Sequence, residues 1–499
     1  MNRTFVKIFQ IYVFAFAFFF ASRPLDDADF WWHLKTGQYI VEQGVIPRTD
    51  FFSFTNYGKP WVAHEWLSEV VFYLGYSWFG YGSLIFTFAV LAVLAFWLVT
   101  RRFHSHPFIF APAVLLGVWS ILPTIGVRPR VFTLLFSAAY LALLNSFHRS
   151  EKGRLIWLTV PLMAVWVNLH GGFLMGFVLL GLGIAGLLLD TLIEKQSIRG
   201  IWNRLRTLSL VLVSCAVAAL LNPHGWRIYL FPFEIFLSPV QQQSVRDWLS
   251  PNFHQPELFP LAGLILLTIA VLALSPKRPR PSEVLLFVAT LFATLKSNRH
   301  MAILALVAVP LIIRYLQHWV SFLASTVAFN ERPRATFSRA TVLVAIALLL
   351  PLLIFVPKLA AEVYGPPKQN VVRVPIKAVE YMKENGIGGP TFTESNMWGG
   401  YLIWAVPSNP VYIDGRIDMY GDQFVREFIS IVSGSVRWEE PFARHQVKNV
   451  MLRPKSHLAR SLQEAPEWQQ LYEDEMTVVF SRRPEPSVAH AAPREWSKN

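Results

Sequence analysis

The sequence predicts a polytopic α-helical membrane protein with about eleven transmembrane helices and a small C-terminal α/β domain outside the membrane. Of its 499 residues, 54% are hydrophobic and only 15% are charged. Soluble domains carry about 25% charged residues, so this chain has too few charged side chains to cover its surface in water. The second observation is a series of apolar runs, most of them long enough to cross a bilayer. Together the two observations exclude a cytosolic enzyme.

The apolar runs are separated by polar residues, Pro or Gly. A run of about 17 to 25 residues crosses the hydrocarbon core, and the shorter runs fit tilted, kinked or re-entrant helices. The first run also fits a signal peptide because Arg3 and Lys7 accompany it, but it is long for one and lacks a small-residue cleavage site before Asp26. The runs lie near residues 5–22, 82–100, 108–125, 131–147, 155–167, 173–193, 207–221, 259–274, 284–295, 301–313 and 340–356.

The distribution of Lys and Arg predicts how the chain is threaded. The loops that follow residues 100, 147, 193, 274 and 313 carry more Lys and Arg than the loops between them. Basic loops stay in the cytoplasm, so we expect a cytoplasmic N-terminus and an outer C-terminus, as in a bacterial inner membrane protein. The same loops account for the net charge of +13, and nucleic acid is not expected as a partner. The lone Cys215 excludes an internal disulfide and a cysteine-ligated zinc cluster.

Two extramembrane regions are predicted, both on the outer side. The first is the loop at 23–80, which belongs to a transmembrane domain of residues 1–356; helical patterns at 29–43 and 62–79 flank a turn-rich stretch at 46–60. The second is an α/β domain of residues 357–482, followed by a disordered tail at 483–499. Within this domain, helical patterns lie at 376–385, 423–433 and 457–464, and strand-like pieces lie at 411–413, 449–452 and 476–480.

An acidic cluster opens the first outer loop. Asp26, Asp27 and Asp29 precede His33, and the spacing of Asp26, Asp29 and His33 sets them on one face of a helix that starts here. Helix capping explains any one of these acids, but three in four positions exceed what a cap requires. A carboxylate near a His at the membrane surface suits a general base that deprotonates a hydroxyl.

Cationic residues stand at other outer turns. Arg128, Arg130 and Arg299 fall at the ends of apolar runs, where a guanidinium can form two hydrogen bonds with a phosphate, and His300 follows Arg299. Snorkelling or contact with lipid headgroups explains each arginine singly. As a group opposite the acids, they predict a pocket for an anionic lipid headgroup.

Further polar residues on the same side are candidates for a substrate pocket. The pairs at 168/170 and 222/224 also fit helix-end caps. The candidate pocket residues are His33, His64, Glu65, Asn168, His170, Asn222 and His224. The sequence starting at His64 begins like the HExxH zinc motif but has Ser68 at its last position, and no Walker A, GxGxxG or GxSxG motif is present.

The first outer loop resembles that of the GT-C membrane glycosyltransferases, such as protein O-mannosyltransferases and lipid A aminoarabinose transferases. The similarity covers about residues 23 to 80. It comprises acidic residues just after the first transmembrane helix, a juxtamembrane helix, a Gly/Pro turn, a Lys-Pro element and a second juxtamembrane helix. The residues that carry it are 27–34, Gly37, Gly44, Pro47, 58–61 and 64–67.

This resemblance implies a sugar donor on polyprenyl phosphate and an acidic residue of the first loop that activates an acceptor hydroxyl. By its spacing to Gly44 and Pro47, Asp29 matches the family's catalytic acid and Asp27 would assist it. These enzymes often carry a second acid directly after the first, whereas here Phe30 follows Asp29, so either aspartate remains a candidate. Some GT-C oligosaccharyltransferases bind a divalent metal through this loop, but no metal or other cofactor is predicted here.

The sequence leaves the acceptor open as protein, lipid or polysaccharide. An alternative function is a carrier or flippase for a lipid-linked glycan, but such a protein needs ionisable groups near the bilayer midplane, whereas here they gather at one face. A non-catalytic envelope assembly protein would leave the acidic loop without a purpose. In the outer domain, 398–401 and 414–416 resemble short elements of some membrane glycosyltransferases, and they also fit a helix entry and a turn after a strand.

Overall fold

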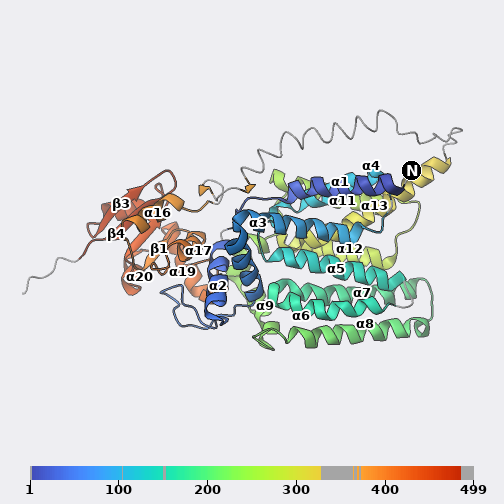
Figure 1. Ribbon diagram of the computed structural model, residues 1–499, viewed down its shortest axis with the longest axis horizontal. Coiled ribbons are helices and arrows are strands. Elements are labelled where there is room, and N and C mark those ends of the chain that lie inside the picture. The colour runs from blue at the N-terminus through green and yellow to red at the C-terminus, as the bar shows by residue number, and fades with distance from the viewer. Residues whose placement is uncertain are drawn as a thin grey trace, which may run out of the picture. The chain divides into compact units, whose positions relative to one another are not determined.

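The computed structural model describes residues 3–27, 29–103, 105–149, 153–326, 363–364, 368–369 and 373–484. The chain forms two compact units. The first comprises Met1–Arg48 and Pro60–Arg373, and the second comprises Thr49–Lys59 and Val374–Asn499. The chain therefore passes into the second unit twice, once within the first outer loop and once after the helices (Figure 1).

In its described residues, the first unit consists of helices and short 3-10 turns. The helices are α1 (Arg3–Ala21), α2 (Phe30–Gln43), α3 (Trp66–Thr100), α4 (Pro107–Ser120), α5 (Arg130–Arg149), α6 (Thr159–Leu169), α7 (Leu174–Ile193), α8 (Ile198–Ala219), α9 (Arg227–Leu237), α10 (Pro239–Ser244), α11 (Phe259–Ala273), α12 (Pro281–Lys296) and α13 (Met301–Thr326). The 3-10 turns are η1 (Leu122–Thr124), η2 (Arg154–Leu158), η3 (Gly171–Phe173), η4 (Arg246–Trp248), η5 (Pro256–Leu258) and η6 (Asn298–His300).

The helical membrane fold predicted from the sequence is confirmed. Within the described residues, six helical segments are long and apolar enough to cross a membrane, and three apolar helices are shorter. The six are Trp66–Thr100, Arg130–Arg149, Gly171–Ile193, Ile198–Ala219, Pro256–Ala273 and Asn298–Phe322, and the shorter ones are Val6–Ala21, Pro107–Ser120 and Arg154–Leu169. The predicted run at 340–356 and most of the predicted tail lie outside the described residues.

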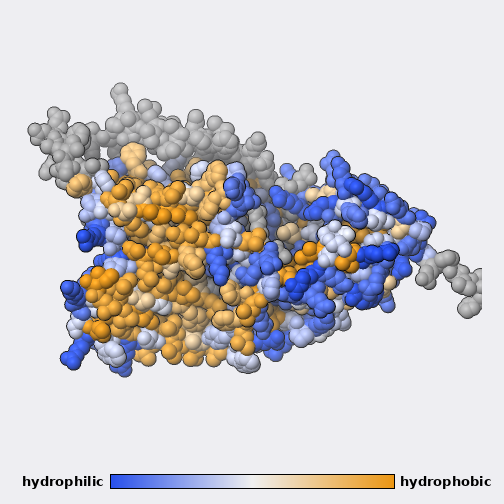
Figure 2. Space-filling model, turned by 180° about the vertical axis from the view of Figure 1, so that it is seen from behind, coloured by the Kyte–Doolittle hydropathy of each residue, from blue (hydrophilic) through white to orange (hydrophobic). Residues whose placement is uncertain are grey.

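The centre of the helical unit is α13, which contacts α4, α11 and α12. Its apolar window is 67% buried, against 28% for α8, so α13 lies inside the bundle while α8 lies at its edge. Large apolar side chains remain exposed on several helices, among them Leu210, Val213 and Val217 of α8. They contribute to a broad apolar surface over the helices (Figure 2), which is the surface that lipid would cover.

Two glycines shape the predicted juxtamembrane helices. At Gly37 of α2, a β-carbon would lie 2.0 Å from the carbonyl oxygen of Glu69, so α2 rests directly on the backbone of α3. Gly80 has non-helical dihedral angles inside α3, with φ at 73°. A left-handed φ of this kind favours glycine. The kink at Gly80 separates the juxtamembrane part of α3 from the part that the sequence predicts to cross the membrane.

The second unit contains a four-stranded mixed sheet in the order β1-β2-β4-β3. Strands β1 and β2 are parallel, whereas β4 runs antiparallel to both β2 and β3. The strands are β1 (Thr391–Thr393), β2 (Asn449–Leu452), β3 (Trp468–Glu473) and β4 (Val478–Arg482). The helices are α16 (Ile376–Glu384), α17 (Asn396–Ala405), α18 (Ile417–Tyr420), α19 (Asp422–Ser433), α20 (Glu439–Arg444) and α21 (His457–Glu464).

The stretch at 411–413, expected as a strand, forms only isolated bridges. Val411 bridges to Thr391 and to Ser53, a residue of the first outer loop. Residues 49–59 thus lie alongside Val411, where the Val411 amide donates to the Phe52 oxygen and the Phe54 amide donates to the Val411 oxygen. Thr55 adds a hydrogen bond to the Tyr412 oxygen at 2.6 Å.

A buried ion cluster fixes this loop segment within the second unit. The Arg416 guanidinium donates to Asp50 at 2.8 Å and to both carboxylate oxygens of Asp414. Asp50 also accepts hydrogen bonds from the amides of Phe52 and Ser53. Because Asp414 and Arg416 are 0% and 1% exposed and are engaged with each other, the short 414–416 element has a structural role in the fold.

Candidate active site

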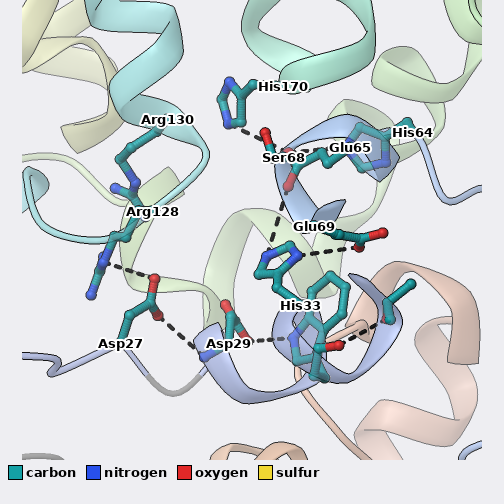
Figure 3. A network of polar contacts seen from close by, with 12 residues as sticks. Asp27, Asp29, His33, His64, Glu65, Ser68, Glu69, Arg128, Arg130 and His170 are labelled. Atoms are coloured by element: carbon teal, nitrogen blue, oxygen red, sulfur yellow. Dashed lines mark hydrogen bonds and ion pairs between the residues drawn. The ribbon is translucent and has the colours of Figure 1, made fainter. Parts of the chain in front are cut away.

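The candidate catalytic acids lie where α2 begins (Figure 3). The Asp29 amide donates to Asp27 Oδ1 at 3.2 Å, and Arg128 Nε contacts Asp27 Oδ2 at 2.9 Å. Asp29 occupies the N-cap position, but its side chain makes no capping hydrogen bond and instead accepts one from Trp32 Nε1 at 3.1 Å. The capping alternative therefore does not account for the Asp29 carboxylate, while Asp27 is held by an arginine.

The surroundings of Asp29 strongly favour its protonated form. Removal of the carboxylate from water, together with the negative charge of Asp27, raises the pKa of Asp29 to about 7, although His33, Trp32 and Arg128 oppose the shift. Such a carboxyl changes its protonation state near neutral pH, as a general base requires.

His33 lies on α2 and faces two glutamates. Glu65 directly precedes α3, and Glu69 lies in α3 itself. The Nδ1 of His33 faces Glu69 Oε1 at 3.3 Å and its Nε2 faces Glu65 Oε2 at 3.8 Å. Burial disfavours the charged ring, but the hydrogen bond to Glu69 and the charge of Glu65 outweigh it and raise the pKa of His33. With both ring nitrogens facing carboxylates, His33 is stabilised as an imidazolium.

Glu65 joins three histidines. Its Oε1 faces His64 Nε2 at 3.2 Å and His170 Nε2 at 3.6 Å, in addition to the contact of Oε2 with His33. Burial alone would raise the pKa of Glu65, but the facing histidines, His64 first, hold that pKa well below its usual range. Glu65 is therefore a fixed anion at the centre of the cluster.

His170 is held in the neutral form. Burial lowers the pKa of His170 to about 3. Its Nδ1 accepts the Gly172 amide hydrogen at 2.9 Å and contacts Thr133 Oγ1 at 2.7 Å. A ring nitrogen that accepts carries no proton, so Nε2 bears the hydrogen and points it at Glu65.

A cavity of about 400 Å³ adjoins this cluster and has one cationic end. Its polar lining includes Arg130, Arg299 and His300 together with His64, Glu65 and His170. The remainder is mainly apolar, with Phe231, Phe233 and Phe236 from α9 among the lining residues. The volume is within the range of small-molecule sites, and the lining suits an anionic head joined to an apolar chain.

The N-terminal ends of three long helices meet at this cavity. Arg130 begins α5, Gly171 and Gly172 lead into α7, and Arg299 and His300 lead into α13. Helix N-termini carry partial positive charge and bind anions. Within the described residues, Arg130 Nη1 and His300 Nδ1 are buried and have no hydrogen-bond partner. The cavity thus combines cationic groups with unused hydrogen-bonding capacity.

The four candidates for donor-phosphate binding separate into two sets. Arg130, Arg299 and His300 line the cavity, whereas Arg128 contacts Asp27 and does not. Arg130 also pairs with Asp247, and this charge holds the pKa of Asp247 at about 2 despite its burial. The guanidinium of Arg299 lies 4.2 Å from the ring centroid of Trp248.

Three of the substrate-pocket candidates connect helix ends instead of lining the cavity. Asn168 accepts from Trp66 Nε1 at 2.7 Å and from Asn222 Nδ2 at 3.3 Å. The Asn222 side chain also caps the His224 amide at 3.0 Å. These contacts join the start of α3 to the ends of α6 and α8, as expected for residues at helix ends.

Glu69 and Asp247 belong to the site but were not predicted from the sequence. Glu69 follows Glu65 by one helical turn, and this i,i+4 spacing on a helix beside His33 was an available signal. Asp247 lies in the 3-10 turn η4 next to Trp248, and no sequence pattern relates it to Arg130. Within the described residues, no three His, Cys, Asp or Glu side chains are arranged to hold a metal ion.

No protein-family model and no curated protein matches the sequence. Solved structures do match. The oligosaccharyltransferase of Archaeoglobus fulgidus aligns with a TM-score of 0.54 and 13% identity, over 88% of this chain and 69% of its own, and a structure of the same enzyme, AglB, holds an inhibitory peptide and a dolichol phosphate. The mycobacterial arabinofuranosyltransferase AftD aligns with a TM-score of 0.52 and 13% identity, over 97% of this chain and 40% of its own.

ArnT from Cupriavidus metallidurans, bound to undecaprenyl phosphate, aligns with a TM-score of 0.50 and 15% identity, over 96% of this chain and 98% of its own. These alignments cover most of the chain and agree with the resemblance of the first outer loop. At such low identity they establish the architecture, so the chain has the fold of the GT-C membrane glycosyltransferases.

Proposed function

We propose that the protein transfers a sugar from a polyprenyl phosphate to an acceptor hydroxyl, with the cavity as the site of the donor phosphate. The observation that carries this proposal is the cationic end of an otherwise mainly apolar cavity, formed where three helices begin. A phosphate attached to an isoprenoid chain matches both parts of this lining. Arg130, Arg299 and His300 would hold the phosphate, and the aromatic residues of α9 would contact the chain.

Asp29 is the proposed general base. As the acceptor oxygen bonds to the anomeric carbon, Asp29 takes the hydroxyl proton, and the bond between that carbon and the phosphate oxygen breaks. The bonding electrons leave with the polyprenyl phosphate, whose charge Arg130 and Arg299 stabilise. A single displacement of this kind inverts the anomeric centre. The raised pKa of Asp29 favours it over Asp27, which is already paired with Arg128.

The remaining polar residues would position these groups. Glu65 contacts His33, His64 and His170, so it ties α2 and the loop before α3 to the start of α7. Asn168, Asn222 and His224 support the same region from the ends of neighbouring helices. The ligands named for AglB and ArnT, a dolichol phosphate and an undecaprenyl phosphate, support a lipid phosphate as the donor carrier.

The Lys and Arg distribution favours an outer location for this chemistry in a bacterial inner membrane. In that orientation, the candidate site and the second unit face away from the cytoplasm. The acceptor is then a protein, a lipid or a polysaccharide of the envelope.

The proposal is tested with purified full-length protein, a panel of polyprenyl-phosphate sugars and membrane extract as the acceptor source. The measurement is the polyprenyl phosphate released by the wild type and by Asp29→Asn. We expect release by the wild type and a loss of about 10²- to 10⁴-fold in the variant. Asp26→Asn is the matched control, because Asp26 lies on the same loop but is exposed.

Each outcome bears on one part of the proposal. Equal release by Asp29→Asn and the wild type would contradict the role of Asp29. If no donor is consumed while lipid phosphate still binds, the carrier function replaces the transferase. Arg130→Gln separates binding from chemistry, since it should raise the donor KM more than it lowers kcat.

A further inference from the structure

A second cavity of about 330 Å³ lies toward the opposite ends of the same helices. It is lined by the last turns of α5 and α7, the first turns of α8 and α12 and the later part of α13. In Figure 1, α5 and α7 run side by side, in agreement with their direct contacts, and α12 also contacts α7. The 20 residues of α5 span roughly 30 Å, and the two ends of this helix carry a polar group of each cavity, Arg130 at the start and His148 near the end. Between these ends, the linings of the two cavities come within a few residues of each other along α7 and α13.

The lining of this second cavity is part apolar and part polar. Leucines from several helices line it, including Leu141, Leu182 and Leu311. Its polar lining contains Arg102, Arg204, Arg280 and Arg314, which come from four different parts of the chain, and His148. Arg102 and Arg280 are exposed, so the charge is concentrated at the mouth while the leucines form the floor.

The four arginines share the lining of this cavity with three acidic residues, Asp190, Glu194 and Glu283. Arg314 pairs with Glu283, but within the described residues the guanidinium groups of Arg102, Arg204 and Arg280 have no acidic partner. Arg204 and Arg280 act electrostatically on the same His148, and Arg280 acts on Arg314. Like charges held together in this way repel one another, and a bound anion would relieve the repulsion.

The acidic residues of this cavity are engaged elsewhere. Both oxygens of Asp190 bind Ser282, accepting from its amide at 2.8 Å and from its hydroxyl at 2.6 Å. Glu194 accepts from Gln196 at 2.7 Å. Within the described residues, neither carboxylate forms an ion pair with Arg204 or Arg280, although the charge of Asp190 acts on the same His148.

We propose that this second cavity binds an amphiphile with a phosphate head and a hydrocarbon chain, as a site separate from the candidate active site. The arginines bind the phosphate and the leucines bind the start of the chain. Basic pockets between transmembrane helices are known to bind anionic lipid headgroups, and the Lys and Arg distribution assigns this end of the bundle to the cytoplasm. A bilayer phospholipid and an isoprenoid phosphate share this chemistry. The inference does not depend on the proposed transferase activity.

The test measures lipid retained by the purified full-length protein in native mass spectrometry, together with its Tm. The probes are phosphatidylglycerol, phosphatidylcholine with the same acyl chains, undecaprenyl phosphate and inorganic phosphate. The test variant is the double substitution Arg204→Gln with Arg280→Gln. Arg206→Gln is the matched control, since Arg206 is exposed on the same helix and does not line the cavity.

We expect phosphatidylglycerol to bind and to raise the Tm more than phosphatidylcholine. The double variant should bind it about tenfold more weakly, and Arg206→Gln should bind it like the wild type. Replacing the same two residues by lysine keeps the charge and should preserve binding, which separates a lost ligand from a misfolded protein. If undecaprenyl phosphate is the only lipid that binds, Arg130→Gln is used to remove binding at the first cavity. The undecaprenyl phosphate that is still retained should then be lost when Arg204→Gln and Arg280→Gln are added.

Three results would overturn the inference. Equal retention of phosphatidylglycerol and phosphatidylcholine would show that binding does not depend on the net charge of the lipid headgroup. An equal loss in Arg206→Gln would show that general surface charge is responsible. A full effect of inorganic phosphate alone would show that the apolar floor takes no part.

Discussion

The protein has two charge clusters, one buried and one largely half-buried, and they are built in opposite ways. In the second unit, Arg416 lies between Asp50 and Asp414, and Tyr420 donates a further hydrogen bond to Asp414 at 2.9 Å. In the first unit, Asp27, Asp29, Glu65 and Glu69 face His33, His64, His170 and Arg128. The Arg416 cluster has one fixed arrangement of charges. The cluster of the candidate site has several groups whose protonation depends on their neighbours.

The difference distinguishes a structural cluster from a candidate site. Arg416 keeps its proton, because the two neighbouring aspartates raise the pKa of a group that is already basic, despite its burial. In the candidate site, the pKa of Asp29 is about 7 and that of His33 is raised. Glu69 Oε2 is buried and has no hydrogen-bond partner in the described residues. In a cluster that only stabilises the fold, buried polar atoms are expected to be paired and pKa values near neutral pH are not needed.

The largest expected effect concerns the structural cluster. Arg416→Met leaves Asp50 and Asp414 buried without their cation, which should destabilise the second unit by about 3–5 kcal/mol. Thermal unfolding and protease sensitivity of the second unit measure it, with the exposed Arg437→Met as control. If Arg416→Met kept its stability but lost transferase activity, the two clusters would not differ in the way described.

The next prediction concerns pH. If Asp29 is the base, the rate should rise with pH and level off above about 7, because only the ionised carboxylate accepts a proton. Asp27→Asn removes the negative charge that helps to raise the pKa of Asp29, so the midpoint should move down by about one pH unit. The measurement is kcat/KM against pH for both proteins. An unchanged midpoint would mean that another group limits the rate.

A smaller effect is expected at Glu69. The pKa of His33 is raised in the folded protein, so its contribution to stability is fully present below its ordinary pKa of about 6.5 and is lost as the pH rises through the folded-state value. Glu69→Gln removes a carboxylate partner of His33. The free energy of unfolding that is lost over this pH range should therefore be smaller by about 1 kcal/mol. Tm measured at a series of pH values tests it, and an unchanged slope would contradict the partnership of His33 with Glu69.

The smallest expected effect is at Asn168. Its carbonyl oxygen accepts from Trp66 and Asn222, and it does not line the cavity. Asn168→Ala should cost about 1 kcal/mol of stability while the donor KM changes less than about threefold. A tenfold rise in KM with normal stability would instead assign Asn168 to the donor site.

Local patterns in the sequence were sufficient to predict most of the longer helices, but α9 and α17 were not predicted. The apolar runs predict helices from composition alone, and the run at 449–452 matches β2 residue for residue. Strand β3 was missed because Trp468–Glu473 is mostly polar and exposed, as an edge strand can be. Residues 411–413 have strand-like composition, but in this stretch Val411 forms only isolated bridges, with Ser53 and with Thr391.

The contacts of the site depended on packing that the sequence does not reveal. Arg130, Arg299 and His300 all fall at helix ends and line one cavity; their binding of an anion stays a prediction. Arg128 differs because Asp27 lies within its reach. The contact of His33 with Glu69 requires α2 to rest on α3 at Gly37, and that close approach is visible only in three dimensions.

The position of residues 49–59 has a consequence for biosynthesis. Asp50 precedes its partner Arg416 by 366 residues, and at about 5–20 residues per second a ribosome needs roughly 20 to 70 seconds to make that stretch. During this time the segment has left the ribosome while the residues it packs against do not yet exist. We therefore expect residues 49–59 to be among the earliest parts of the chain to be synthesised and among the last to acquire their native contacts.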